Sequence, residues 1–117
     1  MKKGEIKTAV MYINAEELGY TMGSVGAVQA FISAAMLHVK RNAATYLTSF
    51  FGSPVLGVAT FVATYLSAAF SALATKLNKK GIKVTFTVTC VEKVKTQAGQ
   101  KFTYLRWKLT DMDVAWY

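Results

Sequence analysis

The most constraining feature of this sequence is a run of 34 residues, 42–75, that contains no charged side chain. Residues 1–41 hold five basic and three acidic side chains, and residues 76–117 hold nine basic and three acidic ones. A segment this long and apolar has to be covered by the rest of the chain, by a second copy or by lipid. The sequence therefore joins an uncharged centre to a cationic C-terminal part.

The composition describes a folded chain of one domain, spanning residues 1–117. Apolar residues make up 53% of the chain and charged residues 17%, which excludes a chain that is disordered throughout. The net charge of +8 favours anionic partners, such as lipid headgroups or nucleic-acid phosphates. The single Cys90 excludes a disulfide within the chain and a cysteine-rich zinc site.

The N-terminal third predicts a strand followed by a helical region. Residues 5–13 alternate in the way typical of a strand. Asn14, with Glu17 three positions later, predicts a helix N-cap, and Lys40 and Arg41 suit the end of that helix. We expect helical structure over about residues 15–79, broken at residues 52–54. The apolar stripe of the first helix is Leu18, Met22, Val25, Ile32 and Met36.

The second helix is predicted from Val55 to about Leu77, with Pro54 in its first turn. Small residues recur along both helices at spacings that let another helix approach closely. Glycine weakens a helix by about 1 kcal/mol relative to alanine, so a close backbone contact should compensate. The residues predicted to pack helix against helix are Gly19, Gly23, Ala59, Ala63 and Ser67.

The C-terminal part predicts a basic β-hairpin over about residues 82–110. Residues 82–89 alternate apolar and polar side chains, residues 97–100 form a turn, and residues 101–110 return as a second strand. We expect Asp111–Asp113 to turn the chain again and residues 112–117 to form a short aromatic terminus. The fold class is therefore α+β, in which the N-terminal strand and the hairpin form a small antiparallel sheet packed by two long apolar helices.

Whether the uncharged centre crosses a membrane stays open at this stage. Residues 54–75 are long enough to span about 30 Å of hydrocarbon as a helix. However, alanine, glycine, serine and threonine dominate the segment, and these residues contribute little to insertion. The alternatives are burial against the sheet or a partner, and insertion into a membrane only under some conditions.

Basic and aromatic residues alternate along the predicted hairpin, which is the candidate site for an anionic partner. Such a ribbon can enter a nucleic-acid groove, stack bases on exposed rings, or lie on an anionic bilayer. The aromatic residues of the predicted hairpin are Phe86, Phe102, Tyr104 and Trp107. The same aromatic residues can instead pack against the helices. The candidate cations are Lys83, Lys93, Lys95, Lys101, Arg106 and Lys108, and the candidate interfacial aromatics are Trp107, Trp116 and Tyr117.

No motif predicts an enzyme. His38 is the only histidine and stands beside cationic residues, and the sequence has no paired metal ligands and no phosphate-cradling loop. We expect Cys90 to be a small core residue. The sequence predicts no catalytic residue, no metal, no cofactor and no small-molecule substrate. It also lacks a recognisable cleavable signal peptide, so we expect a cytoplasmic or membrane-associated protein.

The leading functional hypothesis is a non-enzymatic small basic protein that self-assembles or associates with membranes. Its small-residue helices would pack in a homo-oligomer, and its basic ribbon would face an anionic surface. The alternative is a nucleic-acid-binding module that uses the basic hairpin. In general composition, the Gly/Ala-rich helical stretch with a lysine-rich, tryptophan-containing end resembles cationic bacteriocins. That resemblance implies a third alternative, a membrane-active antimicrobial protein.

Overall fold

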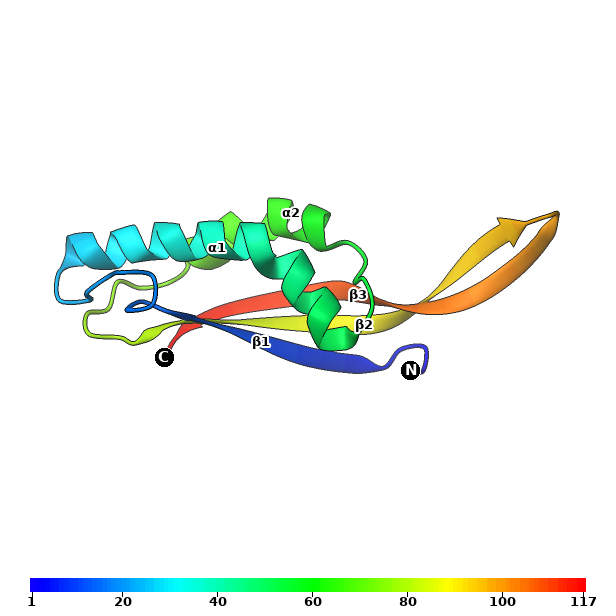
Figure 1. Cartoon of the computed structure of the whole chain (residues 1–117), viewed down its shortest axis with the longest axis horizontal. Helices are drawn as coiled ribbons and strands as arrows, with labels where there is room; N and C mark the ends of the chain where they lie inside the picture. Colours follow the sequence, from blue (N-terminus) through cyan, green and yellow to red (C-terminus); the bar gives the residue numbers. More distant parts are fainter.

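The computed structural model describes residues 1–117 and shows one three-stranded sheet with two helices on the same face (Figure 1). The elements follow in the order β1 (Ile6–Asn14), α1 (Val25–Phe51), α2 (Val58–Ser71), β2 (Gly81–Gln97) and β3 (Gln100–Trp116). This arrangement confirms the predicted α+β fold. The molecule measures 61 × 22 × 21 Å, because the β2–β3 hairpin extends well beyond the helices (Figure 1).

The sheet is antiparallel, with β2 between β1 and β3. Every second residue of β2 from Ile82 to Cys90 is buried, and the residues between them are only half-buried. This is the period-2 pattern of a strand with one face on the core and the other face open. The buried face lies under the helices, and the open face carries Lys83, Thr85, Thr87 and Thr89 of β2.

β3 does not turn at Asp111–Asp113 as the sequence analysis predicted. Met112 pairs with Phe86 and Asp113 with Thr85, so the strand continues to Trp116 and includes most of the predicted aromatic terminus. The pairing shifts between Thr87 and Val88, which leaves Thr110 without a partner as a β-bulge. The bulge takes up one residue, so the apolar side chains before and after it both reach the core.

α1 begins much later than predicted, at Val25. The side chain of Asn14 does accept a hydrogen bond from the Glu17 amide at 3.0 Å, but only turns follow it, and Gly19 has a left-handed φ of 83°. The helix is capped instead by Ser24, whose hydroxyl accepts from the Ala27 amide at 3.2 Å. Its buried stripe repeats every three or four residues and consists of Val28, Phe31, Ala35, Val39, Ala43 and Leu47.

α1 also ends later than predicted, beyond Lys40 and Arg41. The buried stripe continues through residues 42–51, and Gly52, in the left-handed conformation, ends the helix. The segment between the two helices, residues 52–57, then runs back to the sheet. Leu56 donates its amide to the Trp107 carbonyl at 2.8 Å and accepts from the Leu109 amide at 3.0 Å, which covers part of the free edge of β3.

α2 is shorter than the predicted helix over residues 55–77. Because the backbone of Leu56 pairs with β3, the helix cannot start at Pro54, and it begins at Val58 after Gly57. It has 14 residues and ends at Ser71. No helix of the structure combines the length and the hydropathy that crossing a membrane requires.

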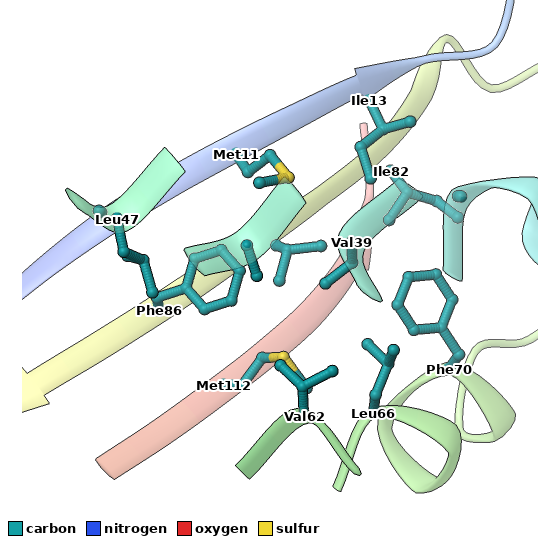
Figure 2. Packing of buried hydrophobic residues seen from close by; sticks show 14 of the residues in the cluster. Met11, Ile13, Val39, Leu47, Val62, Leu66, Phe70, Ile82, Phe86 and Met112 are labelled. Atoms are coloured by element: carbon teal, nitrogen blue, oxygen red, sulfur yellow. The ribbon is translucent and has the colours of Figure 1, made fainter. Parts of the chain in front are cut away.

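One hydrophobic cluster of 23 buried residues contains side chains from all three strands and both helices. Figure 2 shows its centre, where Phe86 of β2 lies beside Leu47 of α1, and Met112 of β3 lies beside Val62 of α2. Cys90 belongs to this cluster and is 1% exposed, so the prediction of a core cysteine is confirmed. Within the uncharged segment 42–75, six residues are buried in this cluster and most of the others are exposed; the six are Ala43, Leu47, Val58, Val62, Leu66 and Phe70.

Candidate functional site

The outer part of the β2–β3 hairpin, residues 91–106, is a free two-stranded ribbon, here called the arm (Figure 1). It projects from the rest of the molecule, here called the body, which contains the helices, β1 and the other residues of β2 and β3. None of its residues is buried, whereas Cys90 and Trp107, which face each other at its base, are 1% and 4% exposed. At about 3.3 Å per residue, the arm reaches on the order of 20 Å from that pair. The inward-facing apolar pattern of both strands stops where the helices end.

A tight turn closes the tip of the arm, as predicted for residues 97–100. Ala98 and Gly99 both have left-handed φ values, 52° and 78°, between the paired residues Gln97 and Gln100. Two left-handed residues are typical of the hairpin turn whose twist matches that of its strands. The turn therefore fixes the register of the two strands along the whole arm.

This register brings cations and aromatic rings together on one face of the arm. Lys93 pairs with Tyr104, Lys95 pairs with Phe102, and Arg106 pairs with Val91. Directly opposite residues in adjacent antiparallel strands point to the same side of a sheet, as do residues two positions apart. We call the face made by Lys93, Lys95, Phe102, Tyr104 and Arg106 the basic–aromatic face.

The same alternation continues from the arm into the body. Lys83 lies on the open side of β2, and Lys108 pairs with Thr89 on the same side of the sheet. Five of the six predicted cations therefore share one face of the β2–β3 hairpin. Lys101 is the exception, because it pairs with Thr96 and lies on the opposite side of the arm.

The cations of the arm have no carboxylate partners. The two ion pairs of the structure join the N-terminal amino group to Glu5 at 4.0 Å and Lys3 to Glu92 at 3.4 Å. Glu92 is the only acidic residue of the arm, and it faces the side opposite Lys93. The basic–aromatic face therefore presents uncompensated positive charge to solvent.

Two aromatic side chains of the arm are also left exposed. Phe102 is 50% exposed and Tyr104 is 39% exposed. The guanidinium of Arg106 lies over the Tyr104 ring, 5.2 Å from its centroid. Exposed rings gain free energy when a partner covers them, and an arginine beside a ring keeps its charge while it stacks.

The predicted interfacial aromatics instead make contacts within the protein. The centroids of the Trp107 and Phe51 rings lie 5.5 Å apart, and the Lys7 ammonium lies over the Trp107 ring, 5.6 Å from its centroid. Trp116 is half-buried and donates its indole N–H to the Ala74 carbonyl at 2.8 Å. Tyr117 is half-buried and meets Tyr12 edge-on at 5.3 Å.

The predicted helix-packing residues divide into two groups. Gly19 and Gly23 lie in the connection before α1 and therefore not on a helix. Ala59, Ala63 and Ser67 do lie on one side of α2, where they are exposed and line a groove between α1 and α2. The groove has a volume of about 480 Å³, and its α1 wall includes Met36, Leu37 and Lys40.

Comparison of the chain with protein-family models, with curated proteins and with solved structures found no match. The arm and the groove between α1 and α2 are therefore the two candidate functional surfaces of the chain. The sequence predicts Phe102 and Tyr104 on the hairpin, but the residues predicted to be interfacial are Trp107, Trp116 and Tyr117. The alternation along β3 is the signal that separates them, because Trp107 pairs with the buried Cys90, whereas Phe102 and Tyr104 pair with Lys95 and Lys93 on the opposite face.

Proposed function

We propose that this chain is a non-enzymatic nucleic-acid-binding protein whose arm contacts the phosphates of its partner. The observation that carries the proposal is the projecting ribbon with unpaired cations on a single face. A two-stranded ribbon is narrow enough to follow a nucleic-acid groove or a single strand. Lysine and arginine side chains along it can neutralise successive phosphates.

The arrangement of charge favours a linear polyanion. Lys93 and Lys95 follow one strand, and Arg106 and Lys108 follow the neighbouring one. Phosphates of a nucleic acid repeat along a line in the same way. Lys83 is separated from these four cations by Asp111 and Asp113 on the same face. The threonines between these lysines add hydroxyl groups, which are common partners of phosphate oxygens.

The apolar residues of the arm are not arranged for insertion into a bilayer. The turn at its tip is flanked by Gln97 and Gln100, which would have to enter the membrane first. Val94, which is 61% exposed, pairs with Thr103 on the side opposite Phe102. Because exposed apolar groups are divided between the two faces, neither face presents a continuous apolar surface to lipid.

The proposal is tested by titrating labelled 20-nucleotide DNA and RNA with the protein at several salt concentrations. We expect log affinity to fall linearly with log salt. Lys93→Gln combined with Lys95→Gln should weaken binding and reduce the slope by about 1.4 on a single strand, at about 0.7 per phosphate contact. The matched control, Lys76→Gln with Lys79→Gln in the connection before β2, removes the same charge and should leave the slope unchanged.

Binding of the protein to vesicles of neutral lipids and to vesicles of anionic lipids is measured in the same way. Binding to anionic vesicles together with no salt-dependent binding to DNA or RNA would overturn the proposal in favour of a membrane-associating protein. Equal loss of affinity in the two double variants would also overturn it, because net charge alone would then explain the binding.

The helix groove favours self-assembly as a second candidate function. Its lining is apolar apart from Lys40 and Ser67, and residues 42–75 around it carry no charge, so a second copy can approach there despite the net charge of +8. Small side chains such as Ala59 and Ala63 allow a helix to come close.

Ala63→Leu should fill the groove and lower the mass measured by sedimentation, whereas Ala30→Leu, on an exposed part of α1 outside the groove, should not. An unchanged mass in Ala63→Leu would exclude this groove as the interface.

A further inference from the structure

We propose that the arm selects single-stranded nucleic acid, with Phe102, Tyr104 and Arg106 stacking on bases and Lys93 and Lys95 binding the phosphates. This inference rests on the proposed function and adds the class of nucleic acid and the role of each side chain. It depends on two parallel rows of side chains on the basic–aromatic face.

The first row is planar and belongs to β3. Phe102, Tyr104 and Arg106 are two positions apart, so their side chains leave the same face of the strand at intervals of about 6.8 Å. This interval matches two stacked planes at about 3.4 Å each, which leaves room for one base between successive side chains. The Arg106 guanidinium lies over the Tyr104 ring, 5.2 Å from its centroid, so that interval is already occupied and the interval open to a base is the one between Phe102 and Tyr104.

The second row is cationic and belongs to β2. Lys93 lies opposite Tyr104, and Lys95 lies opposite Phe102. Neighbouring strands are about 4.8 Å apart, so each ammonium group, on its flexible stem, stands beside the planar row rather than on top of it. Neither lysine has a carboxylate partner within the structure.

These two rows correspond to the two sides of a single strand, whose bases and phosphates run in parallel along the chain. A single strand can turn its base planes onto aromatic rings and keep its phosphates toward the lysines. A duplex cannot do so, because its base planes are stacked on each other and only their edges reach the grooves. Phe102 and Tyr104 would contribute much less to duplex binding than to single-strand binding.

The opposite face of the arm provides an internal comparison. It carries Val94 and Thr103 as a cross-strand pair, and it lacks aromatic rings. Val94 is more exposed than Phe102, at 61% against 50%. Substitutions on that face therefore remove exposed side chains of the same ribbon without touching the proposed stacking row.

The experiment measures fluorescence anisotropy of a labelled 12-nucleotide single strand, of its duplex, and of an abasic strand with the same number of phosphates. The wild-type protein should bind the single strand at least about tenfold more tightly than the abasic strand, since stacking on each base adds to the phosphate contacts. Phe102→Ala with Tyr104→Ala should lose that difference and leave duplex binding nearly unchanged. Val94→Ala with Thr103→Ala should behave as wild type.

The aromatic exchange Phe102→Tyr with Tyr104→Phe keeps both rings and should restore single-strand affinity. Because no residue of the arm is buried, the alanine variants should keep the melting temperature of the wild type. Equal affinity of the wild type for the normal and the abasic strand would overturn the stacking inference while leaving the proposed function intact. Absence of salt-dependent binding to all three nucleic acids would overturn the proposed function itself.

Discussion

The guanidinium of Arg106 lies over the ring of Tyr104, 5.2 Å from the ring centroid, and both side chains stand on the projecting arm. The contact holds the arginine beside the ring without neutralising its charge. A planar surface and a full positive charge are thus presented together, about 7 Å from Phe102 along the same strand. The arm can therefore bind a partner that has both planar groups and negative charge through the same two side chains.

Shortening the arm should leave the body as stable as before. Deleting residues 93–96 together with residues 101–104 keeps the turn and removes an even number of residues from each strand, so the remaining residues keep their faces. Because residues 91–106 contain no buried side chain, the free energy of unfolding in urea should change by less than about 0.5 kcal/mol. A loss of about 2 kcal/mol or more would mean that the arm is part of the core.

Gly81 should not tolerate a side chain. A Cβ atom there would overlap the Ile13 carbonyl oxygen and lie 2.8 Å from the Tyr117 hydroxyl oxygen. Gly81→Ala should therefore destabilise the protein by about 1–3 kcal/mol, the usual cost of overpacking. At Gly26, in the first turn of α1, a Cβ atom meets nothing within 4 Å, so Gly26→Ala should be neutral or stabilising. Equal effects in the two variants, measured by thermal unfolding, would contradict this packing at the start of β2.

Tyr46 links α1 to the outer edge of the sheet, because its hydroxyl donates to the Val10 carbonyl of β1. Burial, and to a smaller extent Tyr12, raises the pKa of Tyr46 above its ordinary value of 10.0. The folded state therefore holds this proton more tightly than the unfolded state. The resulting stabilisation is fully present below pH 10 and is lost as the pH rises through the raised pKa.

Tyr46→Phe should accordingly cost about 0.5–1.5 kcal/mol at neutral pH, the typical contribution of one hydrogen bond. The difference from wild type should shrink above pH 10 when both proteins are unfolded in urea at each pH. Tyr65→Phe removes an exposed hydroxyl of α2. It should change neither the free energy of unfolding at neutral pH nor the dependence of that free energy on pH. A difference that grows with pH would show that the Tyr46 hydroxyl is not held as described.

The thiol of Cys90 should be inaccessible in the native protein. Cys90 is 1% exposed and faces Trp107 in the last buried pair before the arm. A thiol reagent should label it only as fast as the sheet opens, and labelling should become complete within the mixing time in strong denaturant. Rapid labelling of the native protein would indicate that the base of the arm is frayed.

Much of the sheet could be predicted from local pattern. The alternation from Ile82 onward gives the buried face of β2 directly, and Gly99 identifies the turn. The same alternation predicts which lysines share a face. These features depend on the period of the strand and on the φ of a turn residue, both of which are local properties.

The helix boundaries could not be predicted because distant contacts determine them. Asn14 makes a cap-like hydrogen bond, yet no helix follows it, since the connection turns at Gly19 and the chain continues to Ser24. Leu56 pairs with β3, more than fifty positions later in the sequence, and this pairing delays the start of α2. Helix propensity depends on neighbouring residues only, so neither contact can be predicted from it.

The candidate site was predicted only in part, because aromatic character alone does not indicate which face of the hairpin a residue occupies. Phe86 and Trp107 are as aromatic as Phe102 and Tyr104, and all four stand on the hairpin. Phe86 and Trp107 lie on the face of the hairpin that packs against the helices, whereas Phe102 and Tyr104 pair with Lys95 and Lys93 on the opposite, open face. The face that a ring occupies depends on its position in the strand and not on its aromatic character.

The most direct test of the account follows backbone amide chemical shifts of the ¹⁵N-labelled protein as an unlabelled 12-nucleotide single strand is added. The account predicts saturable shift changes concentrated in residues 91–106, strongest near Phe102, Tyr104 and Lys93, with the amides of α1 and α2 almost unchanged. Shift changes concentrated in the two helices, or no changes at a concentration where anisotropy reports binding, would contradict the claim that the arm is the nucleic-acid-binding surface.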